Sequence, residues 1–160
     1  MTAWTEHLAR LGATVDEAAP SVTFSDAASE ARAVDDATVA VPLLHLGTIR
    51  SQGPDSAAFL HNLVSNDVKH MEADTAAWNS FNSPKGRMIA SLLVWTEDGG
   101  HALALSADIL PAFLKKFSMY VLRSKVKLAD ARADVALIGV AGAQAEAVVR
   151  AVGAALPTAD

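Results

Sequence analysis

Hydrophobic and polar positions become regularly patterned from about residue 37 onward. An apolar run at 39–46, extended by residues 46–50, predicts a strand. The turn Gly53-Pro54-Asp55 ends this strand and predicts the start of a helix, because proline is favoured in the first helical turn. Apolar residues then occupy adjoining stripes of that helix, which we expect to end near Asn66.

The middle of the chain predicts a hairpin and an amphipathic helix. Residues 76–81 and 88–95 both predict strands, and the second is apolar at nearly every position, as in a strand covered on both faces. An acidic, glycine-rich turn at 97–100 leads into a return strand at 101–105. Between 109 and 121, apolar residues recur at helical spacing.

The two ends of the chain are patterned differently. Residues 124–128 predict a half-exposed strand, 135–140 a buried strand, and 143–156 an alanine-rich helix. At the other end, a short amphipathic helix is followed by a stretch without a sustained period. We therefore expect two parts, with 1–36 forming an N-terminal helix and variable connection and 37–160 forming one folded region.

This order of elements predicts an α+β fold, with helices packed on a largely antiparallel sheet. The helical and alternating periodicities converge on one apolar layer. We expect the core to contain Phe59, Leu60, Leu63, Leu103, Leu105, Phe113, Leu114 and Phe117.

Composition narrows the class of protein. Hydrophobic residues make up 51% of the 160 residues, which excludes global disorder, and the net charge of −5 excludes a basic field over the whole protein. Cysteine is absent, so disulfides, thiolate metal sites and cysteine nucleophiles are excluded. The sequence contains neither an apolar run long enough to span a bilayer nor a signal-peptide pattern, and we expect a cytoplasmic protein without a membrane partner.

Few residues offer chemistry on their own. The five histidines have no recognised metal-ligand spacing, so we expect surface or boundary positions and no metal ligand. The glycines of 139–142 precede a helix, but the lysine of a phosphate-binding loop is missing, and a tight turn explains them. A basic cluster at 115–127 fits a solvated surface, with protein or RNA contact as the alternative. No catalytic residue stands out.

Three segments carry a more specific pattern. They are 53–68 (GPDSAAFLHNLVSNDV), 78–95 (WNSFNSPKGRMIASLLVW) and 120–126 (YVLRSKV). Together they resemble the N-terminal half of the folate-binding superfamily that contains the glycine-cleavage aminomethyltransferases and the YgfZ-type proteins of iron–sulfur cluster assembly. The resemblance covers roughly residues 44–142 and implies the N-terminal part of the aminomethyltransferase folate-binding fold.

The resemblance also distinguishes two branches. Active aminomethyltransferases have acidic residues where this chain has Ala90 and Ser91. Without a carboxylate, proton transfer and stabilisation of a developing cation lack an agent. The resemblance therefore implies a folate-binding accessory protein that supports iron–sulfur cluster assembly or repair and, through it, tRNA modification. The alternatives are an aminomethyltransferase using tetrahydrofolate and a protein- or RNA-interaction module, so enzymatic activity is left open.

A second departure concerns the C-terminal half of the family. The YgfZ-type signature K-G-C-x-x-G-Q-E belongs to a later part of those chains and is absent from these 160 residues. We therefore expect an N-terminal piece or a shortened relative, with the C-terminal half of the family missing.

The resemblance places the folate cleft around the end of the first helix and the following hairpin turn. A pterin pocket needs an apolar or aromatic wall, a few hydrogen-bond donors and positive charge for the glutamate tail. The residues that supply these groups are Asn66, Phe81, Asn82, Ser83, Lys85, Gly86 and Arg87. Each also has an ordinary explanation, as a helix end, a turn or, for Phe81, a core position. The implied cofactor is tetrahydrofolate or another folate, and the implied partners are iron–sulfur proteins or their assembly machinery, without direct contact to nucleic acid.

Overall fold

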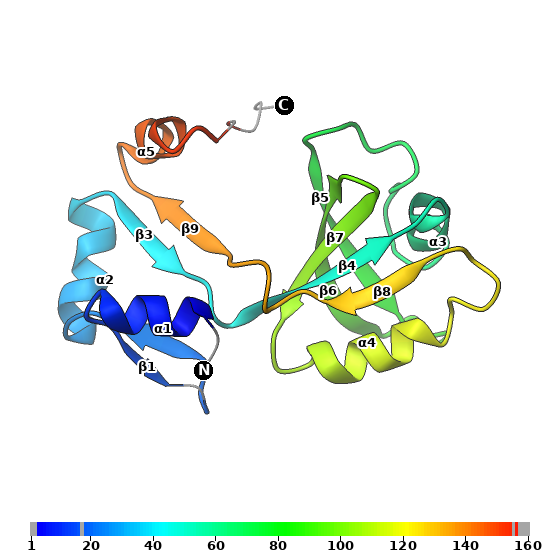
Figure 1. Cartoon of the computed structure of the whole chain (residues 1–160), viewed down its shortest axis with the longest axis horizontal. Coiled ribbons are helices and arrows are strands. Elements are labelled where there is room, and N and C mark those ends of the chain that lie inside the picture. The colour runs from blue at the N-terminus through cyan, green and yellow to red at the C-terminus, as the bar shows by residue number, and fades with distance from the viewer. Residues whose placement is uncertain (1–2, 17, 155, 157–160) are drawn as a thin grey trace. The chain divides into compact units, whose positions relative to one another are not determined.

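The computed structural model describes residues 3–16, 18–154 and 156 (Figure 1). The helices are α1 (Ala3–Arg10), α2 (Ala27–Asp36), α3 (Ser56–His61), α4 (Leu110–Ser118) and α5 (Ala145–Ala151). The strands are β1 (Thr14–Asp16), β2 (Ser21–Thr23), β3 (Val39–Pro42), β4 (Leu46–Gln52), β5 (Ala76–Asn82), β6 (Met88–Glu97), β7 (Gly100–Ser106), β8 (Lys127–Asp130) and β9 (Ile138–Ala141).

The chain divides into two compact units, Leu46–Val135 and Met1–His45 with Ala136–Asp160. This division differs from the boundary expected after residue 36. The reason is a long-range pairing: β3 lies antiparallel to β9, so the strand segment predicted over 39–50 divides between the two units.

The Leu46–Val135 unit contains a five-stranded sheet in the order β5-β6-β7-β4-β8. Every neighbouring pair in it is antiparallel, which confirms the predicted fold class. The turn between β6 and β7 includes Gly99 at a φ of 77°, a left-handed conformation that favours glycine. Strand β5 forms one edge of the sheet and β8 the other.

The core of this unit lies where α3 and α4 meet one face of the sheet. Phe113 and Phe117 of α4 pack edge to face on Phe81 of β5, and Phe59 of α3 packs edge to face on Phe117, all within one buried cluster. Of the core residues predicted from the sequence, six are buried, whereas Leu63 and Leu114 are half-buried and pack against the cluster.

The other unit has more regular structure in its N-terminal part than the sequence predicts. The segment expected to be a variable connection forms the β1–β2 hairpin and α2. Asp26 caps α2 by accepting a hydrogen bond from the backbone nitrogen of Ser29 (3.0 Å). Oε1 of Glu30 accepts bonds from the backbone nitrogens of Phe24 (2.6 Å) and Ser25 (2.7 Å). These hydrogen bonds fix the start of α2, although the sequence there has no periodic apolar pattern.

Candidate functional site

The loop after α3 lies along the free edge of β5 and extends the sheet there. Val64 forms an isolated antiparallel bridge with Phe81. The backbone nitrogen of Ser65 donates to the carbonyl oxygen of Ser80 (3.0 Å), and the Ser80 nitrogen donates back to Oγ of Ser65 (2.9 Å). Two of the three segments that the sequence singles out, 53–68 and 78–95, are therefore neighbours in space.

Asn66 is fixed to β5 by two hydrogen bonds. Its backbone nitrogen donates to Oδ1 of the buried Asn79 (2.9 Å), and its side-chain amide donates to the carbonyl oxygen of Trp78. Helix α3 already ends at His61, so Asn66 does not cap it. Asn66 therefore attaches the loop to the edge strand of the sheet.

The turn between β5 and β6 is closed by three hydrogen bonds. The nitrogen of Gly86 donates to the carbonyl oxygen of Ser83 (2.8 Å), the nitrogen of Ser83 donates to the carbonyl oxygen of Arg87 (2.8 Å), and the nitrogen of Arg87 donates to Oγ of Ser83 (3.1 Å). Gly86 has a φ of 75°, as this turn requires. Lys85 and Arg87 are exposed, and the side-chain nitrogen of Asn82 donates to Oγ of Ser80 (3.1 Å).

Phe81 occupies the core, which is the alternative that the sequence left open. Its side chain is 3% exposed, and its ring lies 5.6 Å from that of Phe113 and 5.2 Å from that of Phe117, both edge to face. Tyr120 contacts the same ring at 5.7 Å. The phenyl group therefore holds β5 onto α4 and presents no exposed wall.

The opposite face of β5 and β6 carries an exposed aromatic residue instead. Trp78 is paired with Leu93, and Ser80 with Ser91. Directly paired residues share one face of an antiparallel sheet, so these four side chains lie on the face away from Phe81. The Trp78 side chain is 65% exposed. The sequence analysis did not single out Trp78, although its alternating strand position beside two polar residues indicated an exposed side chain.

Ala90 and Ser91 point to opposite faces of the sheet. They are the positions at which the family resemblance implies carboxylates in active aminomethyltransferases. Ala90 is paired with Phe81 and is 3% exposed within the core. Ser91 is exposed on the outer face. Of the two positions, only the second is open to solvent.

Two histidines converge on one carboxylate beside this edge. Nδ1 of His61 lies 3.1 Å from Oδ1 of Asp67, and Nδ1 of His70 lies 2.7 Å from Oδ2 of Asp67. The hydrogen bond from His70 lowers the pKa of the Asp67 carboxyl. Across residues 3–16, 18–154 and 156, no group of three or more such side chains is arranged to hold a metal ion. The cluster links the end of α3 to its loop.

The GCVT N-terminal domain model matches residues 5–159 of the chain. The chain belongs to this family. Because the match covers nearly the whole sequence, the GCVT N-terminal domain includes both compact units, and the resemblance found in residues 44–142 is confirmed and extended in both directions.

Relatives of this GCVT N-terminal domain carry several names. The "Iron-sulfur cluster assembly factor IBA57 homolog, mitochondrial" of Mycosarcoma maydis is 34% identical over 133 residues, which cover 72% of this chain and 32% of the relative. The "tRNA-modifying protein YgfZ" of Klebsiella pneumoniae (strain 342) is 35% identical over 107 residues, covering 67% and 32%. An "Aminomethyltransferase" of Shouchella clausii (strain KSM-K16) is 28% identical over 130 residues, covering 81% and 35%. The chain thus matches about one third of the length of each.

A solved structure shares the fold of this GCVT N-terminal domain. The glycine cleavage system aminomethyltransferase T from Bartonella henselae superposes with a TM-score of 0.62 at 15% sequence identity. The superposition covers 74% of this chain and 32% of that one. At this identity the likeness concerns the fold alone. Within the described ranges, no helix is both long and apolar enough to cross a membrane.

Proposed function

We propose that this chain is part of a folate-binding accessory protein that supports iron–sulfur cluster assembly or repair and, through it, tRNA modification. The observation that carries the proposal is its identity of 34–35% with proteins named IBA57 and YgfZ, combined with the absence of a carboxylate at Ala90 and Ser91. Because the chain matches about one third of those relatives, we propose this role for the protein to which these residues contribute.

The residues of the β5 edge fit a folate. A pterin ring and its benzoyl group need a flat apolar surface, and the exposed indole of Trp78 supplies one. A glutamate tail needs cations, which Lys85 and Arg87 supply at the turn. Asn82 lies four positions after Trp78, which corresponds to roughly 13 Å along a strand. This spacing suits a long ligand with an aromatic end and an anionic end.

Each proposed site residue then has a separate task. Trp78 stacks on the ring system, and Asn66 positions the loop beside it by its hydrogen bonds to β5. Asn82 and Ser83 offer polar groups at the turn, which Gly86 allows to close. Phe81 contributes from the core by fixing β5, not as a wall of the cleft. A bound tetrahydrofolate supplies a carrier for one-carbon units.

Aminomethyl transfer is the second candidate, since a relative at 28% identity is named aminomethyltransferase. In this chain Ser91 can donate or accept a hydrogen bond on the outer face, but it cannot carry a negative charge beside a developing cation. Release of a one-carbon unit onto tetrahydrofolate by the purified protein would support this alternative over the accessory role.

The proposed partners are folate and iron–sulfur proteins or their assembly machinery, and the proposed location is the cytoplasm. We propose no direct contact between this chain and nucleic acid, because tRNA modification would be reached through an iron–sulfur enzyme. Complementation of a bacterial strain lacking YgfZ, by expression of the protein to which these residues contribute, tests this role. Restored methylthiolation of its tRNA supports the proposal, and unchanged tRNA in cells that contain the folded protein contradicts it.

Folate binding is tested by calorimetric titration with 5-formyltetrahydrofolate. We expect Asn66→Ala and Arg87→Ala each to weaken binding roughly tenfold, which corresponds to about 1.4 kcal/mol. Arg10→Ala, at the end of α1, is the control for loss of an arginine outside the proposed cleft. Unchanged affinity in both cleft variants would remove the assignment, whereas lost binding with a preserved thermal midpoint would support it.

A further inference from the structure

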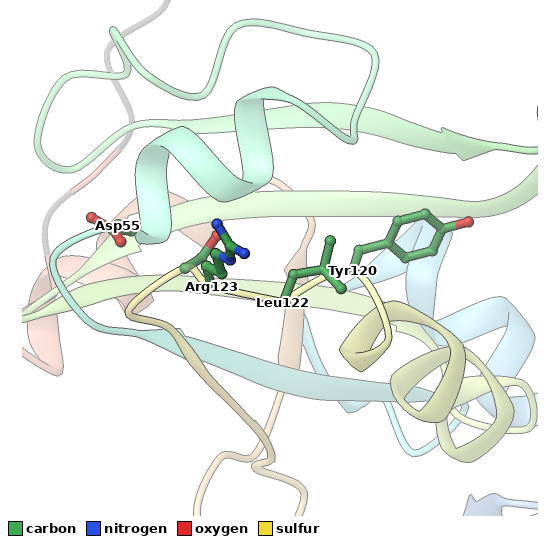
Figure 2. Close-up of a pocket in the computed structure, with 5 residues that line it drawn as sticks. Asp55, Tyr120, Leu122 and Arg123 are labelled. Carbon is green, nitrogen blue, oxygen red and sulfur yellow. The ribbon is translucent and has the colours of Figure 1, made fainter.

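The loop between α4 and β8 presents large apolar and cationic side chains to solvent. We define the loop surface as Met119, Tyr120, Leu122, Arg123 and Lys125. Met119 is 65% exposed and Leu122 is 88% exposed, the largest exposed fraction among the large apolar residues of the described ranges. An open pocket of about 740 Å³ lies against this loop (Figure 2).

Leu122 has a backbone conformation that residues other than glycine rarely adopt. Its φ is 43°, in the left-handed region, where a bulky residue meets its own backbone. Strain of this kind persists only where the surroundings impose it, and it concentrates at functional positions. A glycine or an asparagine would relieve the strain. Because the Leu122 side chain is largely exposed, packing within this unit does not require a leucine at this position.

The loop is fixed on either side of this residue. The backbone nitrogen of Lys125 donates to Oδ2 of Asp55 (2.7 Å), and the nitrogen of Ser124 donates to the carbonyl oxygen of Val121 (2.8 Å). Val121 packs against the core from inside the loop. Leu122 and Arg123 are therefore exposed on a fixed backbone, which lowers the entropy lost on binding, and Figure 2 shows both side chains lining the pocket.

Positive charge gathers around the same loop although the whole chain is acidic. Residues 115–127 contain five lysines and arginines and no acidic residue, whereas the chain carries a net charge of −5. In the described part of the chain, none of these five cations is ion-paired. Among the residues that the structure describes, Asp55 is the one acidic residue that lines the pocket, and one of its carboxylate oxygens accepts the backbone bond from Lys125. The excess of unpaired positive charge attracts an acidic partner and repels a basic one.

We propose that the loop surface binds an acidic segment of a partner protein that carries large apolar side chains. Exposed methionine and tyrosine beside arginine match the composition of protein interfaces, and Leu122 adds exposed apolar area beside them. A nucleic-acid backbone would use the cations but gain little from Leu122 or Met119, since phosphate contacts are electrostatic. The surface is separate from the proposed folate site, because its Tyr120 contacts Phe81 on the α4 side of β5, whereas Trp78 lies on the opposite face.

A library of random dodecapeptides displayed on phage tests the proposal on the 160-residue chain. Selection on the wild-type protein, with counter-selection on Leu122→Asn, should enrich peptides rich in Asp and Glu with one or more of Leu, Phe and Trp. Absence of enrichment, or enriched peptides without acidic residues, would overturn the proposal. An enriched peptide is then synthesised with a fluorophore, and its Kd is measured by anisotropy.

Two variants separate recognition from folding. We expect Leu122→Asn to weaken peptide binding about tenfold while the thermal midpoint stays the same or rises, because asparagine tolerates the left-handed conformation. Arg123→Glu should weaken it at least as much. Leu11→Asn and Arg150→Glu are the matched controls, since both residues are exposed in the other unit. Equal binding by Leu122→Asn, or binding of transfer RNA that exceeds peptide binding and is insensitive to Leu122, would overturn the proposal.

Discussion

Oγ of Ser56 lies 3.0 Å from Nδ1 of His101 in the buried interior beneath α3. The Ser56 hydroxyl also donates to the carbonyl oxygen of Ser51 (2.8 Å), and the Ser51 hydroxyl lies 2.8 Å from it. With the Ser56 proton used in this way, a neutral His101 protonated at Nδ1 completes the network as donor. The first turn of α3 is thereby joined to β4 and β7 through buried polar groups.

Burial of His101 makes the stability of the fold depend on pH. Desolvation lowers the pKa of its imidazole below the ordinary 6.5, so the charged form is favoured in the unfolded chain. The stabilisation is fully present above about pH 6.5 and is lost as the pH falls through the folded-state pKa. We expect the unfolding free energy measured in urea to fall between pH 7.5 and 5.5, and to fall less in His101→Gln. His45→Gln, at an exposed histidine, should retain the wild-type slope.

The contact between Gly53 and Lys125 leaves no room for a side chain. A Cβ at position 53 would overlap the carbonyl oxygen of Lys125, and Gly53 has a φ of +125°. We expect Gly53→Ala to lower the unfolding free energy by about 2–4 kcal/mol, from strain and displacement of the loop together. Gly99→Ala, with a φ of +77° and nothing within 4 Å, should lose only about 1–2 kcal/mol. Equal losses by chemical denaturation would contradict the close approach.

A carboxylate should lower the unfolding free energy much more at position 90 than at position 91. Ala90→Asp would place a charge among Phe81 and its neighbours, and we expect a loss of about 3 kcal/mol or more in unfolding free energy. Ser91→Asp lies on the exposed outer face and should change it by about 0.5 kcal/mol or less. Urea unfolding at pH 7 distinguishes the two. Similar losses at both positions would mean that the sheet does not present Ser91 to solvent.

The fold of the central unit followed from the sequence because its signals are local. Periodic apolar residues identified β6, α4 and most of the core. The pairing of β3 with β9 was not predictable in this way, since about 100 residues separate strands whose own sequences carry no partner information. Helix α2 was missed because polar caps at Asp26 and Glu30, not an apolar stripe, define it.

The candidate site was predicted only in part, for a related reason. The family pattern identified the loop of Asn66 and the turn at Lys85, but a motif does not specify which face of a strand each residue occupies. The alternation of β5 places this ring in the core and Trp78 outside. The convergence of His61 and His70 on Asp67 also depends on the path of the loop, which residue spacing does not determine.

The opposite placement of Trp78 and Phe81 gives a paired test of the proposed cleft. Trp78→Leu removes a largely exposed indole, so we expect the unfolding free energy to change by less than about 1 kcal/mol while affinity for 5-formyltetrahydrofolate falls about tenfold or more. Phe81→Leu removes ring contacts with Phe113 and Phe117, and should lower the unfolding free energy by about 1–3 kcal/mol with little change in affinity of the folded protein. Calorimetric titration and urea unfolding of both variants check this. If Phe81→Leu loses folate affinity in the folded state while Trp78→Leu keeps it, the ligand lies on the α4 side of β5 and the proposed cleft is on the wrong face.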